Sequence, residues 1–319
     1  MDLTVHGLAE RVRDSSGEPI WLAGHGTRVR CPTPMAILGA PSGIRSFVPD
    51  EMTVSCGAGT SVEDLSLALA ENGQYVNLPR RSGDSGTVGG ALAVGEGDIY
   101  RLGRGSVRDV LLQAVFVDSH GVSITAGGPT VKNVSGFDLC RLLVGSCGRL
   151  GFLAEVVLRT RPCALATRWF AIEGTSRDIV ASIMAHVKRP TSVLWDGHRV
   201  RLCLEGHPGD IDETVGDLRK ALARPVLESD TPDLDRFPHR WICPPGDVDI
   251  VIAASPGKCV AEIATGIVHH VEPEATPTRH PAVLRIEQRL LDAFDPHDRL
   301  NGGSAVWGSM HLRRAGTSV

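Results

Sequence analysis

The chain has 319 residues, of which 42% are hydrophobic, so it is long enough to bury a sizeable core and to form about two domains. Its net charge of −4 gives no broad positive field, which argues against nucleic acid or an anionic membrane surface as a partner. The longest apolar segment, residues 110–117, is far too short to cross a bilayer, so we expect no membrane span. Charged residues begin at Asp2, with no apolar block of signal-peptide length behind them, which predicts a cytoplasmic protein.

The first half of the chain predicts short strands separated by glycine turns. Residues 52–56 form one predicted strand, and Ser61 caps the helix that follows, because Asp64 stands three residues later in a capping box. A hairpin is expected across Ser119-His120-Gly121. The remaining expected elements are a strand at 19–23, the two hairpin strands at 109–118 and 122–126, a short helix from Asp138 to Leu143, and a long strand at 150–160.

The second half predicts the order β-α-β-β-α-β, which is the ferredoxin-like motif. The expected elements are a strand at 169–172, a helix at 176–187, a hairpin at 192–196 and 200–205, a helix at 211–222, and a final strand at 248–253. Five prolines mark residues 224–247 as a long irregular insertion.

Eight cysteines are scattered along the chain without a CxxC pair. Zinc ribbons and iron–sulfur clusters need closely spaced thiolates, so we expect no metal site. We interpret the thiols as small buried hydrophobes of a protein in a reducing compartment. Cys147, between Ser146 and Gly148, is the candidate for a ligand contact.

The sequence does not contain either of two common nucleotide-binding motifs. Residues 52–70 place a strand, Gly57-Ala58-Gly59 and a helix in sequence, but Val62 stands where a dinucleotide fingerprint needs its third glycine. The next expected strand ends at Pro79 without the acidic residue that binds ribose. The phosphate loop GxxxxGK followed by Ser or Thr is absent from the sequence.

Glycine-bearing turns recur at three places, in residues 23–28, 83–95 and 132–158. Residues 82–98 alone hold six glycines, next to an apolar Ala-Leu-Ala-Val run that a flexible linker would lack. Small residues allow several main-chain N–H groups to point at one buried diphosphate, so three such turns suit one long cofactor. The alternative is that they are only tight turns around strands.

The third segment, KNVSGFDLCRLLVGSCGRLG, resembles the FAD-binding domain of the vanillyl-alcohol-oxidase type, also called the PCMH type. This version most resembles the FAD-binding subunits of bacterial glycolate oxidases. GTVGGALAVG at 86–95 is similar to the family's threonine-hydrophobic-Gly-Gly loop, and AGHGTR at 23–28 to its first pyrophosphate loop. PHDRLNGG at 296–303 is similar to the terminal signature.

The resemblance implies an α+β fold. Residues 1–165 would form a PCMH-type FAD-binding domain of two α+β subdomains, and residues 166–319 a small ferredoxin-like α+β cap or substrate domain whose C-terminal segment returns to the first domain. The implied cofactor is non-covalently bound FAD, although His25 would also allow a covalent link. The residues implied to bind it are Gly24, His25, Gly26, Thr27 and Arg28 at the pyrophosphate, Gly86, Thr87, Gly89 and Gly90 along the pyrophosphate and ribityl chain, and Gly136, Asp138, Gly145, Ser146, Gly148 and Gly151 beside the flavin and the adenosine half.

The implied function is the oxidation of a 2-hydroxy acid by an FAD-dependent subunit that passes electrons to partners. These partners would be a second flavin subunit and an iron–sulfur subunit, through which the chain could lie at the inner membrane. Two alternatives stay open, an accessory assembly subunit with a vestigial flavin site and a stand-alone FAD-dependent alcohol oxidase. Catalytic residues are not identified, because no spacing singles out one of His198, Arg199, Arg201, His207, His239, Arg240, His269 and His270.

Overall fold

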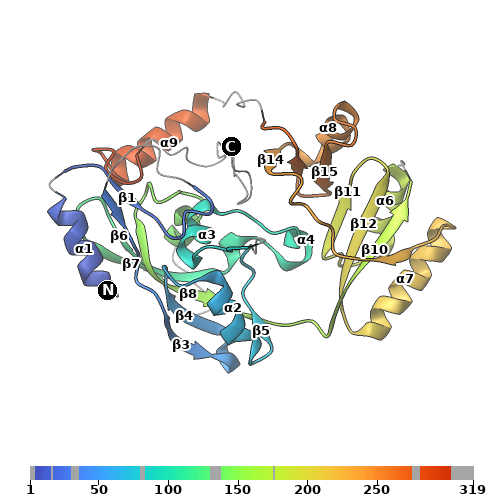
Figure 1. Ribbon diagram of the computed structural model, residues 1–319, viewed down its shortest axis with the longest axis horizontal. Coiled ribbons are helices and arrows are strands. Elements are labelled where there is room, and N and C mark those ends of the chain that lie inside the picture. Colours follow the sequence, from blue (N-terminus) through green and yellow to red (C-terminus); the bar gives the residue numbers. More distant parts are fainter. Residues whose placement is uncertain are drawn as a thin grey trace. The chain divides into compact units, whose positions relative to one another are not determined.

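The computed structural model of the chain describes residues 4–15, 17–29, 36–79, 83–129, 138–174, 177–274 and 281–302. The chain divides into two compact units. Unit 1 comprises residues 1–97, 106–162 and 276–319, and unit 2 comprises residues 98–105 and 163–275. Figure 1 colours the elements along the sequence, so that unit 1 holds both the blue and the red ends of the described chain.

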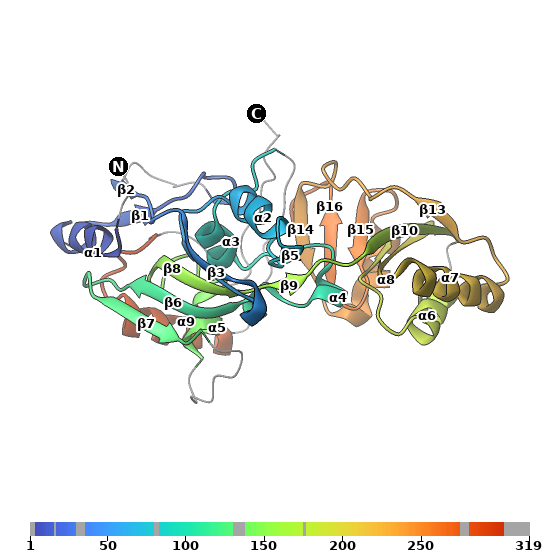
Figure 2. The ribbon, with the colours of Figure 1, turned by 90° about the horizontal axis from the view of Figure 1, so that it is seen from below.

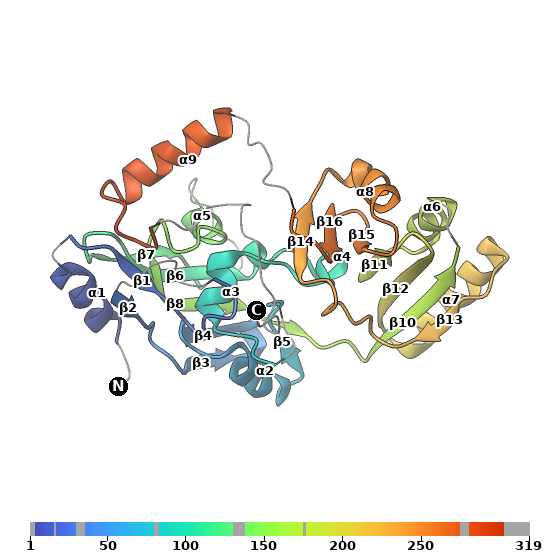
Figure 3. The same cartoon turned by 45° about the horizontal axis from the view of Figure 1, so that its top comes forward.

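A five-stranded antiparallel sheet in the order β3-β4-β8-β6-β7 forms the centre of unit 1. Its strands are β3 (Ile44–Val48), β4 (Thr53–Gly57), β6 (Leu111–Val117), β7 (Ser123–Gly127) and β8 (Phe152–Arg159). The apolar sides of α2 (Val62–Ala70), α3 (Val88–Val94), α5 (Leu139–Leu143) and α9 (Pro281–Phe294) share one hydrophobic core with this sheet. Figure 3 shows α3 beside β8, where the site described below is formed.

Local sequence explains where these helices begin. The Ser61 hydroxyl accepts hydrogen bonds from the Glu63 and Asp64 amides at the start of α2, as the capping box predicts. Asp138 accepts from the Arg141 amide at the start of α5. Unit 1 also contains β5 (Gln74–Tyr75) paired with β9 (Arg161–Pro162), and the single turns η1 (Pro49–Glu51) and η2 (Val107–Asp109).

A second, smaller core of unit 1 joins the two ends of the described chain. Here β1 (Ile20–Leu22) pairs in parallel with β2 (Ala36–Leu38), and α1 (Val5–Asp14) packs nearby through Leu8 and Val12. Residues 295–301 follow α9 and lie against β1, because the Ile20 amide donates to the Arg299 carbonyl at 2.8 Å. We call residues 295–301 the C-terminal return. Its Leu300 is fully buried in this core.

Unit 2 is built on a seven-stranded antiparallel sheet in the order β13-β10-β12-β11-β15-β16-β14. Its elements are β10 (Ala166–Glu173), α6 (Arg177–His186), β11 (Ser192–Trp195), β12 (Arg199–Gly206), α7 (Pro208–Leu222), β13 (Leu227–Ser229), β14 (His239–Ile242), η3 (Pro245–Asp247), α8 (Val248–Ala254), β15 (Cys259–Glu262) and β16 (Ile267–His270). Helices α6, α7 and α8 pack on one face of this sheet (Figure 2). The short α4 (Arg101–Arg104) belongs to this unit too, and Tyr100 beside it packs with Trp169 on the other face.

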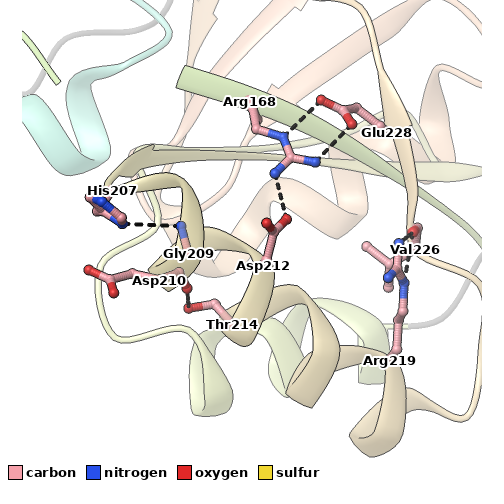
Figure 4. A network of polar contacts seen from close by, with 9 residues as sticks. All are labelled: Arg168, His207, Gly209, Asp210, Asp212, Thr214, Arg219, Val226 and Glu228. Atoms are coloured by element: carbon pink, nitrogen blue, oxygen red, sulfur yellow. Dashed lines mark hydrogen bonds and ion pairs between the residues drawn. The ribbon is translucent and has the colours of Figure 1, made fainter. Parts of the chain in front are cut away.

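The strand order β13-β10-β12-β11 is that of the ferredoxin-like motif, with α6 and α7 as its two helices. The edge strand β13 is tied to its neighbours by Arg168, whose guanidinium contacts Glu228 at 2.9 Å and Asp212 of α7 at 2.6 Å (Figure 4). These two carboxylates raise the pKa of Arg168, so the cation persists at all ordinary pH values.

Two expectations for unit 2 are wrong. Residues 248–253, expected as the last strand, form α8, because burial of Val248 and Ile252 follows helical spacing while Ile250 is exposed. Residues 224–247, expected as an irregular insertion, contain β13 and β14. The fourth strand of the motif is therefore β13, and the strands β15, β16 and β14 extend the sheet beyond β11.

Candidate cofactor site

Two adjoining hollows lie in unit 1 around the N-terminal end of α3. Their open volumes are about 490 and 480 Å³, part of it continuous with solvent. Small side chains predominate in the set that lines both, namely Leu22, Ala23, Gly24, Thr87, Gly90, Ala93 and Asn301. The two hollows therefore form one site that suits a long ligand lying close to the main chain.

The turn after β1 supplies hydrogen-bond donors to the first hollow. Residues 24–26 line this hollow, and in the described part of the chain their amide N–H groups make no hydrogen bond. Gly26 has a φ of 69° and, among the described residues, no neighbouring atom within 4 Å of the position a Cβ would take. Unpaired main-chain donors at a concave surface attract an anionic group such as a diphosphate.

The amides at the start of α3 are used differently, because the protein itself satisfies them. Thr87 caps this helix and accepts from the Gly90 amide at 3.1 Å, while the Gly89 amide donates to the Ala58 carbonyl at 2.7 Å. The Gly86 amide donates to Asp84 at 2.7 Å. The small residues of this second turn therefore form the floor of the site and leave room above it. Fewer of its amide groups are available to a ligand than in the first turn.

The third turn packs against the end of α3. The Gly145 amide donates to the Leu92 carbonyl at 3.0 Å, and the Cys147 amide to the Ala93 carbonyl at 2.8 Å. Burial raises the pKa of the Cys147 thiol to about 12, so at neutral pH this side chain is a protonated, apolar part of the wall.

Asn301 of the C-terminal return lines both hollows and connects them to two separate segments. Its side-chain Oδ1 accepts from the Leu22 amide at 2.8 Å, and its Nδ2 donates to the Cys147 carbonyl at 2.7 Å. The residue is buried and has a φ of 48°, a conformation that Asn tolerates better than most residues. The end of the described chain thus completes the site.

Arg28 and His25 connect the first turn with the second. The buried Arg28 donates to the Ser85 carbonyl at 2.7 Å and to the Pro79 carbonyl at 3.2 Å. His25, at the rim, lies 2.8 Å from Asp84. The hydrogen bond from His25 and then the Gly86 amide lower the pKa of Asp84, so the carboxylate stays ionised at neutral pH.

Most residues implied by the resemblance meet at this site. Those that line the hollows are Gly24, His25, Gly26, Thr27, Arg28, Thr87, Gly89, Gly90, Ser146, Gly148 and Gly151. Gly86, Asp138 and Gly145 do not line them, and Gly136 lies outside the described residues. Their contacts with a cofactor stay predictions.

Many of the glycines also have a packing reason. A Cβ would come within 2.3 Å of the Thr87 hydroxyl at Gly24, 2.5 Å of the Phe116 ring at Gly151, and 2.7 Å of the Asn301 amide at Gly148. At Gly90 the described residues, apart from the chain neighbours and the helix's own backbone, place one atom within 4 Å of that position, the Thr87 hydroxyl at 3.1 Å. Space for a ligand therefore explains Gly26 and Gly90 better than it explains the other glycines.

Sequence reasoning missed several lining residues. Among them are Trp21, Val29, Ala40, Ala58, Gly59, Val94, Leu143 and Leu153. Most of them stand outside the motifs, so only the folded arrangement identifies them. Asn301 had a signal, because it lies in the PHDRLNGG segment that is similar to the family's terminal signature.

The fold and this site define a flavin-binding class of protein, since residues 19–127 match the family described as FAD binding domain. The chain is 30% identical over 173 residues to glycolate oxidase subunit GlcE of Escherichia coli, covering 53% of this chain and 49% of that protein. It is 35% identical over 114 residues to D-lactate dehydrogenase of Archaeoglobus fulgidus, covering 35% of this chain and 25% of that enzyme.

A solved structure of alkyldihydroxyacetonephosphate synthase has a similar fold, with a TM-score of 0.69 at 11% identity, and the match covers 95% of this chain and 75% of that one. The chain spans about half or less of the curated relatives that it matches. Among the described residues we find no helix of the length and apolar character that a membrane crossing requires.

Proposed function

We propose that this chain is a flavin subunit of an FAD-dependent oxidoreductase that acts on a 2-hydroxy acid and passes electrons to partner subunits. The observation that carries the proposal is the row of unpaired amides at residues 24–26 in the described chain, set at one end of a hollow floored by Gly90. Bound there, FAD would supply the redox chemistry by accepting a hydride equivalent from the carbon that bears the hydroxyl. The chain's own residues would bind it, chiefly at the pyrophosphate.

Two observations support partner subunits, namely the name of one relative and the side chains of the described residues. One relative is named as a subunit of glycolate oxidase. The described residues include no group of three or more side chains able to hold a metal ion, so electrons leaving the flavin would need an acceptor that we do not find in this part of the chain. We propose that a second flavin subunit and an iron–sulfur subunit provide this route, from a location in the cytoplasm or at the inner membrane through those partners.

One observation favours the alternative of an assembly subunit with a vestigial flavin site. Five glycines at the three turns are explained by protein atoms closer than 2.9 Å to the position of a Cβ, without any ligand, namely Gly24, Gly86, Gly89, Gly148 and Gly151. On this alternative the scaffold would persist for packing alone.

Purification of the full chain tests the proposal. We expect visible flavin absorption, release of FAD by acid, and reduction of the bound flavin by a 2-hydroxy acid, with or without co-purified partners. A colourless protein that cannot be reconstituted with FAD contradicts the proposal and supports the assembly role. A flavoprotein that other alcohols reduce, and 2-hydroxy acids do not, would retain the cofactor and overturn the substrate class.

A further inference from the structure

The first turn of the candidate cofactor site carries two side chains that can hold a positive charge, and each contacts a carboxylate. Arg28 is buried, with 4% of its side chain exposed, and its Nε lies 3.8 Å from Oε2 of Glu96. His25, at the rim, lies 2.8 Å from Asp84, and its imidazole is a cation only when it is protonated. Each of these two side chains therefore has a counter-charge within the protein.

Glu96 is a shielded carboxylate close to the first hollow. Val94, the last residue of α3, lines this hollow, and Glu96 stands two residues later. Only 12% of the Glu96 side chain is exposed. Glu96 is not among the described residues that line either hollow, so its carboxylate contacts Arg28 from outside the space that is open to a ligand. Because little solvent screens this carboxylate, its charge acts over a longer distance than that of an exposed one.

Arg28 has a structural task in the site. Its guanidinium donates to the Ser85 carbonyl at 2.7 Å and to the Pro79 carbonyl at 3.2 Å, which holds the first turn against the chain that leads into the second turn. These bonds direct two of its nitrogens at protein carbonyls. The hydrogen-bond donors for a diphosphate are instead the amides of residues 24–26, which make no hydrogen bond in the described part of the chain.

The ion pair has an electrostatic consequence for a bound anion. An anion in the first hollow is attracted by Arg28 and repelled by Glu96, so the two effects oppose each other. Loss of the carboxylate charge would leave the guanidinium charge less compensated and make the potential in the hollow more positive. An uncharged ligand would not respond to this change.

We propose that Glu96 sets the affinity of the candidate cofactor site for anionic nucleotides by offsetting the charge of Arg28. The ligand class is a nucleotide that carries a diphosphate, such as FAD. The inference rests on the proposed function, because it takes the diphosphate to lie beside the first turn. Glu96 touches no ligand and acts through Arg28, so its charge and its packing have to be tested separately.

Calorimetry on the full-length chain, freed of flavin, tests the proposal. The probes are FAD and ADP, which carry a diphosphate, and riboflavin, which carries no phosphate. Glu96→Gln keeps the size of the side chain and removes its charge. We expect this variant to bind FAD and ADP about tenfold more tightly than the parent chain, because one weakly screened repulsive charge is lost. Riboflavin should bind equally to both chains, a difference between probes that altered packing alone would not produce.

Three variants control for packing, for net charge and for exposure. Glu96→Asp keeps the charge and should bind every probe within about twofold of the parent chain. Glu71→Gln removes the same charge at the exposed end of α2 and should also bind as the parent does. Asp84→Asn removes a carboxylate whose side chain is 50% exposed, so it should tighten FAD binding less than Glu96→Gln does and lose that gain at high salt.

The parent chain supplies a second measurement if Glu96→Gln fails to fold. Its affinity for FAD should change by less than about twofold between low and high sodium chloride concentrations, because the charges of the first turn are balanced. The proposal is contradicted by a steep loss of FAD affinity with salt in the parent chain. It is also contradicted if Glu96→Gln binds FAD and ADP as the parent does, or if it tightens riboflavin binding as much as FAD binding.

The same samples separate this inference from the proposed function. A parent chain that holds FAD and shows no effect of Glu96→Gln keeps the redox role and loses this inference. A chain whose affinities for FAD and ADP respond to Glu96, but whose bound flavin is not reduced by a 2-hydroxy acid, gives the reverse result. Absence of FAD and ADP binding in the parent and in every variant would contradict both.

Discussion

The side-chain amide of Asn301 donates a hydrogen bond of 2.7 Å to the main-chain carbonyl of Cys147. Both residues have positive φ values, 48° and 57°, so this contact joins two turns in which non-glycine residues are held in the left-handed region. The same side chain also accepts from Leu22. One residue of the C-terminal return therefore fixes two walls of the candidate cofactor site.

Replacement of Asn301 should separate its hydrogen bonds from its backbone conformation. Asn301→Gly removes the two bonds but suits a positive φ, and we expect a loss of about 1–3 kcal/mol in the free energy of unfolding together with weaker FAD binding. Asn301→Ala loses the same bonds and adds left-handed strain, for a further loss of about 1 kcal/mol. Urea unfolding and flavin titration measure both effects. Asn72→Ala, at an exposed turn, serves as the control, and equal values for all three chains would contradict the assignment.

Two glycines should differ in how replacement by alanine affects the stability of the flavin-free protein. Gly90→Ala adds a methyl group to the shared lining of both hollows, while it improves the helix propensity of α3 by up to about 1 kcal/mol. We therefore expect weaker FAD binding with no loss of stability in the flavin-free protein. Gly24→Ala would place its methyl group 2.3 Å from the Thr87 hydroxyl, so it should destabilise the flavin-free protein as well. If Gly90→Ala binds FAD normally, the cofactor does not lie over Gly90.

Alkaline solution should destabilise the chain through its buried thiols. Burial raises the pKa of Cys56, Cys147 and Cys203 from 9.0 to about 12. Between these values the unfolded chain releases protons that the folded chain retains, so the free energy of unfolding falls as pH rises from 9 to 12, by about 1.4 kcal/mol per pH unit and thiol. Below pH 9 the contribution is fully present.

Guanidinium unfolding at pH 8 and pH 10 checks this expectation. Cys203→Ala should show a shallower decline between the two pH values than the parent chain, because one buried thiol no longer ionises on unfolding. Cys163→Ala, which replaces an exposed cysteine, should decline as the parent does. Equal slopes for all three chains would assign the alkaline effect to other groups.

The edge strand β13 should depend on Arg168. Loss of its contacts to Glu228 and Asp212 leaves only backbone pairing and packing to hold residues 227–229 (Figure 4). We expect Arg168→Gln to accelerate amide hydrogen exchange in β13 and to leave β11 unchanged, and we expect added salt to have a smaller effect of the same sign. Lys220→Gln, which removes an exposed pair with Asp217, should change neither strand.

Local sequence signals predicted several elements of both units. Ser61 and Asp138 sit at the starts of helices as expected, since their side chains cap amides only two or three residues away. The β6–β7 hairpin and the long strand β8 also agree with the expected residues, within two positions at each end. These features depend on neighbours in sequence, so the sequence displays them.

The remaining features depend on distant partners. Residues 248–253 are rich in β-branched side chains, yet they form α8, and the strand at the edge beside β10 is β13. The placement of residues 98–105 in unit 2 rests on packing of Tyr100 against Trp169, which no local pattern reveals. Likewise, strand register places Arg240 opposite His269, which their spacing in sequence does not indicate.

The C-terminal return has a consequence for the order of events during translation. Unit 2 draws on residues no later than 275, whereas the small core of unit 1 needs Leu300 and the wall of its hollows needs Asn301. All of unit 2 must therefore be synthesised before the folding of unit 1 can be completed. A chain truncated near residue 290 would contain every residue of unit 2 and would lack Leu300 and Asn301 of unit 1.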